Sequence, residues 1–186
     1  CLDKLLDGAK ILAFTHISNS LGTINPAADL CRAAREAGAV SLVDGAQSAG
    51  HLPVDVRAIG CDFFAFSGHK TCGPTGIGAL YARRDLLASM PPWEGGGEMI
   101  VSVRLENSTF KTGPARFEAG TPNIAGAIGL AAALEYIESI GRDAIFAHDS
   151  ALAARAIAHL ESIPGIRVLG PRGPGTQRGA VASFTM

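Results

Sequence analysis

Short, almost continuously apolar runs mark the first half of the chain. Four of them, each bounded by polar or turn-forming residues, lie at residues 11–14, 39–43, 62–66 and 76–82. Short apolar runs without alternation are typical of strands buried on both faces, as in a parallel sheet covered by helices. The pattern therefore predicts a parallel or mostly parallel sheet, in a domain of the α/β class.

An amphipathic segment separates the first two runs and predicts a helix over residues 27–38. Small and apolar residues recur there at a spacing of three or four, and Gly38 is expected to end the helix. Asn25 directly precedes Pro26, and a capping amide before a proline is typical of a helix start. The order strand, helix, strand favours a crossover unit within one sheet.

The second half of the chain predicts two long helices and a change of subdomain. The expected elements are a tightly packed, alanine-rich helix at 123–140, a helix at 142–163, and strands at 166–170 and 179–186 around a Gly/Pro loop at 170–175. We accordingly assign residues 1–141 to one domain, and residues 142–186 to a connecting helix and the beginning of a C-terminal subdomain.

Composition and charge narrow the class of function. With 186 residues, 47% hydrophobic and 18% charged, the chain has ordinary globular composition and can bury a substantial core. The formal net charge is −1 with scattered charges, so we expect no nucleic-acid partner. We find no membrane-span or leader pattern and no C-x-x-C pair among the four cysteines. These features predict no membrane association, reduced thiols and a cytoplasmic location.

Polar side chains follow three of the predicted strands at the point where each strand ends. The first is followed by THISN, the second by DGAQ and the third by SGHK. Because ligands of open α/β sheets bind at the carboxyl ends of the strands, these clusters predict a site along one edge of the sheet. The side chains concerned are His16, Asn19, Asp44, Gln47, Ser67, His69 and Lys70.

A carboxylate and a lysine at different strand ends suit pyridoxal phosphate, which needs a lysine for its aldehyde and an acid facing its ring nitrogen. Lys70 and Asp44 have these types, and Lys70 alone among the four lysines follows a predicted buried strand. Ser67 and His69 flank Lys70 and are suited to bind the phosphate, while Gln47 is suited to reach the ring hydroxyl. Taken singly, these residues have simpler interpretations, because an Asp-Gly pair is more often a turn and a loop lysine is usually solvated.

Other kinds of site fit the sequence less well. Lys70 precedes the glycines of GPTGIG, whereas a Walker phosphate loop places its lysine after the second glycine. No G-x-G-x-x-G opens a helix after a strand, which argues against a dinucleotide site. His16, His51 and His69 are too dispersed for a metal site, so we expect none.

Five long motifs follow one another along residues 14–141 and carry a family resemblance. They are HISNSLGTINP, LVDGAQSAGHLPVDV, DFFAFSGHKTCGPTGIGALYARRDLL, MPPWEGGGEMI and RFEAGTPNIAGAIGLAAALEYI. Together they resemble the group II cysteine desulfurases and selenocysteine lyases of the class V aminotransferase superfamily. SGHK followed by GPTGIG resembles group II, because group I enzymes tend to carry a lysine where Thr75 stands.

The resemblance implies a fold and an activity. The fold would be that of aspartate aminotransferase, fold type I of the pyridoxal-phosphate enzymes, with part of the large domain and the start of the small C-terminal α/β subdomain in this chain. The enzyme would be a homodimeric transferase that converts L-cysteine or L-selenocysteine to L-alanine. The sulfur would remain on an enzyme cysteine as a persulfide, for iron–sulfur cluster assembly or other sulfur chemistry, and a sulfur-acceptor protein would be a partner.

The matching motif positions imply roles for individual residues. Lys70 would be the catalytic lysine that holds the cofactor aldehyde and moves the α-proton of the substrate. The other implied assignments are Asp44 to the ring nitrogen, Gln47 to the ring hydroxyl, Ser67 and His69 to the phosphate, Asn19 to the cofactor and the substrate carboxylate, and Thr121 to the phosphate of the neighbouring subunit. The PPWEGGG segment would lie near the entrance of the dimer's active site.

The sequence also departs from the family. The nucleophilic cysteine of these enzymes lies in an Arg-x-Gly-x-His-Cys context that does not occur here, and none of Cys1, Cys31, Cys61 and Cys72 takes its place. The family's substrate-carboxylate arginine, its N-terminal phosphate-binding turn and its stacking histidine have no counterpart either. We therefore expect this chain to be an internal fragment, inactive alone. The alternatives are another class V enzyme, such as an aminotransferase, kynureninase or epimerase, and a non-catalytic domain.

Overall fold

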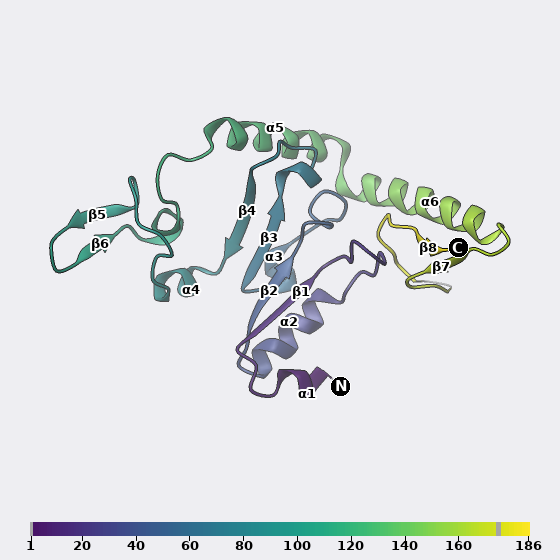
Figure 1. The fold of residues 1–186 in the computed structure, drawn as a ribbon, viewed down its shortest axis with the longest axis horizontal. Coiled ribbons are helices and arrows are strands. Elements are labelled where there is room, and N and C mark those ends of the chain that lie inside the picture. The colour runs from purple at the N-terminus through teal and green to yellow at the C-terminus, as the bar shows by residue number, and fades with distance from the viewer. Residues whose placement is uncertain (1, 174–175) are drawn as a thin grey trace.

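A four-stranded sheet lies at the centre of the computed structural model, which describes residues 2–173 and 176–186 (Figure 1). Its strands, in spatial order, are β1 (Ile11–Thr15), β2 (Val40–Asp44), β3 (Phe63–Ser67) and β4 (Gly78–Ala82). β1, β2 and β3 are parallel, and β4 runs antiparallel to β3. The predicted mostly parallel sheet is confirmed. The sequence did not predict that β4 runs antiparallel.

Helix α2 (Ala27–Glu36) connects β1 to β2 and buries Ala27, Cys31 and Ala34. Gly38 follows it with a φ of +74°, as expected of a helix stop. The predicted capping role of Asn25 is wrong, because its amide donates instead to the carbonyl of Thr15, at 2.6 Å, and the helix has no side-chain cap. Asn25 thus fastens the loop after β1 to the end of that strand.

The core of the sheet region contains two cysteines. Cys31 of α2 and Cys61, just before β3, pack with Val43 and Phe64 and are almost fully buried. Burial raises the pKa of both thiols, that of Cys61 to about 11. Both remain free thiols that behave as small apolar side chains.

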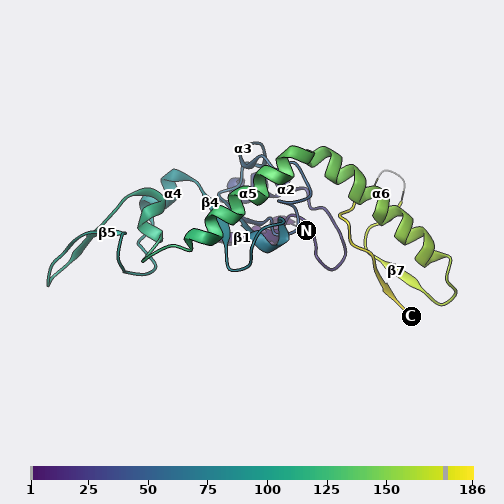
Figure 2. The same ribbon diagram turned by 90° about the horizontal axis from the view of Figure 1, so that it is seen from above.

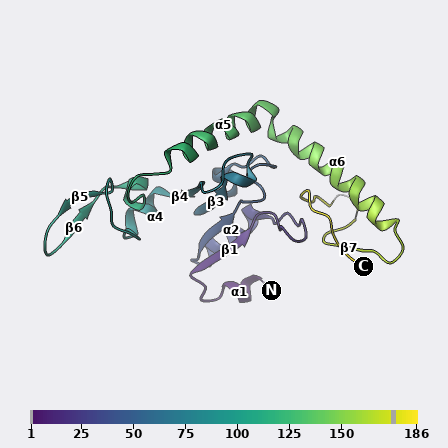
Figure 3. The same ribbon diagram turned by 45° about the horizontal axis from the view of Figure 1, so that its top comes forward.

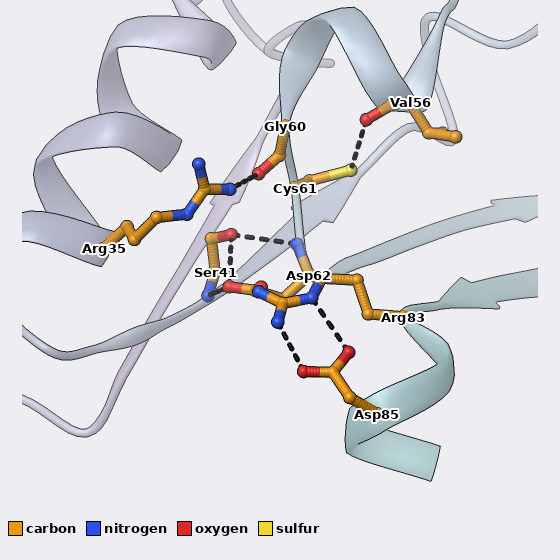
Figure 4. A network of polar contacts seen from close by, with 8 residues as sticks. All are labelled: Arg35, Ser41, Val56, Gly60, Cys61, Asp62, Arg83 and Asp85. Carbon is orange, nitrogen blue, oxygen red and sulfur yellow. Dashed lines mark hydrogen bonds and ion pairs between the residues drawn. The ribbon is translucent and has the colours of Figure 1, made fainter. Parts of the chain in front are cut away.

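A polar network ties the amino end of β3 to its neighbours (Figure 4). Asp62 accepts hydrogen bonds from the backbone and hydroxyl of Ser41 in β2, and Arg83 donates to its other oxygen at 2.7 Å. Arg83 also pairs with Asp85 at the start of α4 (Arg84–Ser89). Burial favours the neutral form of Asp62, but the hydrogen bonds from Ser41 and the contact with Arg83 outweigh it and lower the pKa of this carboxyl.

Several short elements complete the sheet region and its surroundings. They are α1 (Leu2–Leu6), α3 (Val56–Ile59), the 3-10 helices η1 (Gly68–Lys70) and η2 (Gly113–Phe117), and the antiparallel hairpin of β5 (Ile100–Val103) and β6 (Ser108–Phe110). The hairpin projects away from the sheet in two views at right angles (Figures 1 and 2). The sequence pattern did not predict it.

Two long helices lead away from the sheet. α5 (Ile124–Ile140) lies over the ends of β3 and β4, and α6 (Arg142–Glu161) continues toward the antiparallel pair β7 (Arg167–Leu169) and β8 (Ser183–Thr185) (Figure 3). The expected tight packing of the alanine-rich helix holds on one face only, because Ile128 and Tyr136 are largely exposed. The expected Gly/Pro loop at 170–175 includes residues 174 and 175, which lie outside the described residues.

None of the described helices is long and apolar enough to span a membrane alone. Only α5 and α6 taken together meet the length and composition of a span, and they are bent by 77° at the break between them.

Candidate active site

The segments after β1, β2 and β3 leave the sheet at a common edge. In the register of these parallel strands, Thr15 pairs with Asp44 and Asp44 pairs with Ala65. The backbone N–H of His16 then donates to the carbonyl of Asp44 at 2.8 Å. The loop with Asn19, the turn with Gln47 and the segment with Lys70 therefore start from adjacent positions, as the sequence predicted.

The turn after β2 is compact and begins at a glycine that has no room for a side chain. Asp44 Oδ1 accepts a hydrogen bond from the backbone of Ala46 at 2.9 Å, which orients the carboxyl group. A Cβ atom on Gly45 would lie only 2.0 Å from the ring of Phe64. Gln47, in the middle of this turn, is half-buried.

The segment after β3 is closed on itself by hydrogen bonds. Ser67 ends the strand and η1 follows, with His69 and Lys70 exposed. Thr71 is fully buried, and its hydroxyl donates to the carbonyl of Gly68 at 2.9 Å. The backbone N–H of Gly68 donates in turn to Ile77, at 2.8 Å. Lys70 is thus an exposed lysine on a backbone segment that hydrogen bonds hold in place.

The turn after β2 touches the backbone of Lys70. A Cβ atom on Gly50 would lie 2.9 Å from the carbonyl oxygen of Lys70 and 3.4 Å from Thr71 Cα. Only a glycine fits such a close approach without displacing the backbone. The contact brings the segments with Asp44 and Gln47 beside the segment with Ser67, His69 and Lys70.

Helix α5 supports the far side of the lysine segment. The side chain of Asn123, which caps α5, donates to the carbonyl of Gly76 at 3.1 Å. Pro74 lies against Gly129, where a Cβ atom would come within 3.1 Å of the proline ring. The loop that follows Lys70 is therefore held from both sides.

Two predicted site residues lie outside this group. Asn19 is exposed in the loop after β1, where its side-chain oxygen accepts a hydrogen bond from the hydroxyl of Ser20 at 3.3 Å. Thr121 is exposed before α5, on a cavity of about 430 Å³ that Glu98 and Lys111 also line. The structure places Asn19 on a loop adjoining the site edge, and Thr121 by a cavity that none of the other predicted site residues lines within the described part of the chain.

One buried pair at this edge was not foreseen. His16 Nδ1 lies 3.0 Å from the hydroxyl of Ser48, and burial lowers the pKa of the histidine, so that the neutral ring is favoured. The pair joins the loop after β1 to the turn after β2. The sequence placed His16 at the edge but offered no signal for a partner 32 residues away.

The cavities overlap the predicted site only at Gln47 and Thr121 among the described residues. A cavity of about 770 Å³ is lined by residues of β3 and β4 such as Phe66 and Leu80 and by residues of α5 and α6, but by none of the predicted site residues within the described chain. A smaller one is lined by Gln47, His51 and Asp149. The described residues contain no group of three or more metal-ligating side chains.

The family model of the class-V aminotransferases matches residues 1–186, the whole of the sequence. The chain belongs to the class-V aminotransferase family. A probable cysteine desulfurase of Streptomyces coelicolor is 47% identical over 99% of this class-V chain and 44% of its own length. A cysteine desulfurase of an Enterobacter species is 51% identical over 91% of this chain and 42% of its own.

The fold of this class-V chain is similar to solved structures of a cysteine desulfurase and of C-DES. An apo cysteine desulfurase from Thermococcus onnurineus superposes over all of the chain and 46% of its own, with a TM-score of 0.90 and 42% identity. A C-DES mutant with glycine covalently linked to its pyridoxal-phosphate cofactor superposes over 95% of the chain and 47% of its own, with a TM-score of 0.82 and 29% identity. The predicted fold class and the resemblance to cysteine desulfurases are confirmed, and the chain spans less than half the length of these relatives.

Proposed function

We propose that this chain carries the cofactor-binding core of a pyridoxal-phosphate-dependent cysteine desulfurase. The observation that carries the proposal is the meeting of two segments at one sheet edge, one with Asp44 and the other with Lys70, in contact at Gly50. The sequence identity to cysteine desulfurases and the cofactor-linked structural relative support it. Neither segment would suggest this chemistry by itself.

The residues at the edge fit the polar groups of pyridoxal phosphate. When bound, the cofactor supplies an electron sink for a carbanion at the substrate α-carbon. The amine of Lys70 would hold the aldehyde and, once released, move a proton at the α-carbon. Asp44 would keep the ring nitrogen protonated, and its carboxyl is already oriented by Ala46.

The remaining predicted site residues would bind the cofactor and the substrate and orient them. Gln47 would face the ring hydroxyl, Ser67 and His69 the phosphate, and Asn19 the cofactor and the substrate carboxylate. The closed backbone around Gly68 would keep the phosphate-binding hydroxyl and imidazole in fixed positions relative to the lysine.

The proposed enzyme is a homodimer. Thr121 lies apart from the other site residues and is exposed, as expected of a residue that reaches the phosphate of a neighbouring subunit. Trp93, Val103 and Leu105, on the projecting hairpin and the segment before it, are more than two-thirds exposed. We infer that a second subunit would cover these apolar side chains.

The sulfur chemistry would involve a cysteine other than Cys31 and Cys61. Cys31 and Cys61 are buried with raised pKa values, which makes them poor nucleophiles. The substrate would be L-cysteine or L-selenocysteine, in a cytoplasmic enzyme that supplies a sulfur acceptor, for example in iron–sulfur cluster assembly. Residues 1–141 would form part of the large domain and residues 142–186 the start of the small one.

The lysine assignment is tested on the full-length protein with pyridoxal phosphate. We expect a visible absorbance band that Lys70→Ala removes and the matched variant Lys111→Ala keeps. Borohydride reduction followed by peptide mass spectrometry should place the cofactor on the peptide with Lys70. Cofactor fixed by borohydride on a peptide other than that with Lys70, or still fixed to the protein in Lys70→Ala, would disprove the assignment.

The reaction is tested separately, by incubating the full-length protein with L-cysteine. We expect equal amounts of alanine and protein-bound or released sulfur, and no alanine from residues 1–186 alone. A cofactor-loaded protein that forms no alanine from L-cysteine or L-selenocysteine but transforms another amino acid would assign the chain to a different reaction of the family.

A further inference from the structure

One face of α6 meets the turn that carries Gln47. Arg142, Phe146 and Asp149 are spaced at i, i+4 and i+7, so they lie on one side of the helix. Arg142 Nε approaches the carbonyl of Ala49 at 3.5 Å, and Phe146 lines the small cavity beside Gln47. Although α6 leads away from the sheet, its first two turns contact the turn after β2, at the edge of the sheet where the cofactor is proposed to bind.

The shortest of these contacts joins His51 to Asp149. The distance from His51 Nδ1 to Asp149 Oδ2 is 2.6 Å, across 98 residues of sequence. The Asp149 side chain is only 20% exposed and that of His51 is 40% exposed. Partial shielding from water makes such a hydrogen-bonded pair stronger than an ordinary surface ion pair.

The turn at residues 45–52 has few other side-chain ties to the rest of the structure. At its start the N–H of Gly45 donates to the carbonyl of Ala65 in β3, and beyond that point its backbone bonds are internal, with Ala49 donating to Gly45 and Leu52 to Ser48. Within the described residues, four side-chain hydrogen bonds link it to neighbouring elements, one from Asp44, one from His16 and two from α6. The position of Gln47 therefore depends on α6 as well as on the sheet.

We propose that His51 and Asp149 form a positioning pair for Gln47. The pair holds the far end of the turn, so that the amide of Gln47 stays directed at the ring hydroxyl of the cofactor, and α6 couples the C-terminal part of the chain to the cofactor edge. This inference rests on the proposed function, because it assigns a support to one of the cofactor-binding residues.

The test measures the pH midpoint of the visible cofactor band in the full-length protein. Gln47→Ala serves as reference and should shift the midpoint by about half a pH unit or more, the effect of losing one neutral hydrogen bond. Asp149→Asn should shift it in the same direction by at least half as much. Asp149→Asn combined with Gln47→Ala should add nothing further, and Asp149→Glu should restore the wild-type value.

The matched control is Asp143→Asn, at an exposed position in the first turn of the same helix, which should leave the midpoint unchanged. If Asp149→Asn fails to fold, His51→Gln provides the same measurement from the other partner. A lowered melting temperature with a wild-type midpoint, or additive shifts in the double variant, would overturn the inference and leave the proposed function intact. A wild-type protein without a visible band would overturn both.

Discussion

Asp62 Oδ2 accepts two hydrogen bonds from Ser41, one from its backbone N–H at 2.8 Å and one from its hydroxyl at 2.9 Å. The other carboxylate oxygen accepts from Arg83. These bonds join β2, β3 and the segment before α4 at the end of the sheet away from the candidate site (Figure 4). All of the bonds depend on one nearly buried carboxylate.

Replacing Asp62 by alanine should therefore be strongly destabilising. The hydroxyl of Ser41 and the guanidinium of Arg83 would lose their partner, and we expect the free energy of unfolding to fall by about 3 kcal/mol. Urea denaturation would measure the change. Asp85→Ala is the matched control, since it removes the exposed partner of the same arginine, and its effect should be much smaller. Equal effects of the two substitutions would contradict the role given to the buried network.

The same carboxyl predicts a loss of stability in acid. Because the pKa of Asp62 is lower in the folded than in the unfolded protein, its ionised form stabilises the fold. This contribution is complete above the unfolded pKa of about 3.9 and is lost as the pH falls through the lower folded value. Melting temperatures measured from neutral to strongly acidic pH should show an acid decline that is smaller in Asp62→Asn. A parallel decline in both proteins would mean that other carboxyls cause it.

Gly45 should tolerate no side chain. A methyl group there would overlap the ring of Phe64 in the core, so Gly45→Ala should lower the free energy of unfolding by about 1–3 kcal/mol. It should also weaken cofactor binding in the full-length protein, because Asp44 is the preceding residue. Gly97→Ala is the control, since nothing lies within 4 Å of the added atom. Calorimetry and cofactor titration would measure the two effects, and a wild-type response of Gly45→Ala would show that the turn can shift without cost.

Much of the sheet region was predictable because its signals are local. Four apolar runs mark the four central strands, and parallel strands bring the residues at their carboxyl ends to a common edge. The direction of β4 was not predictable, because an apolar run does not encode the orientation of its strand. Asn25 has the residue type of a cap, yet its amide binds Thr15, ten residues earlier in the chain.

The contacts that assemble the candidate site join residues far apart in the sequence, so local sequence patterns do not predict them. Gly50 meets Lys70 only after two strands have paired, and the His51–Asp149 contact joins residues 98 positions apart. The hairpin of β5 and β6 escaped prediction because its strands have only four and three residues beside a glycine-rich segment. The sequence showed which polar side chains follow the strands, but it did not show the long-range contacts that hold them in place.

The exposed hairpin predicts a defect in self-association. Val103 is 72% and Leu105 102% exposed, at the end of β5 and just beyond it, and the proposed dimer would bury them. Val103→Asp would place a charge in that interface, so we expect the dimer dissociation constant of the full-length protein to rise at least about tenfold, an effect of about 1.4 kcal/mol. Sedimentation would measure it, with the exposed tip variant Asn107→Asp as control. A dimer as tight as wild type would show that the hairpin lies outside the subunit interface, and a monomeric wild-type protein would disprove the homodimer itself.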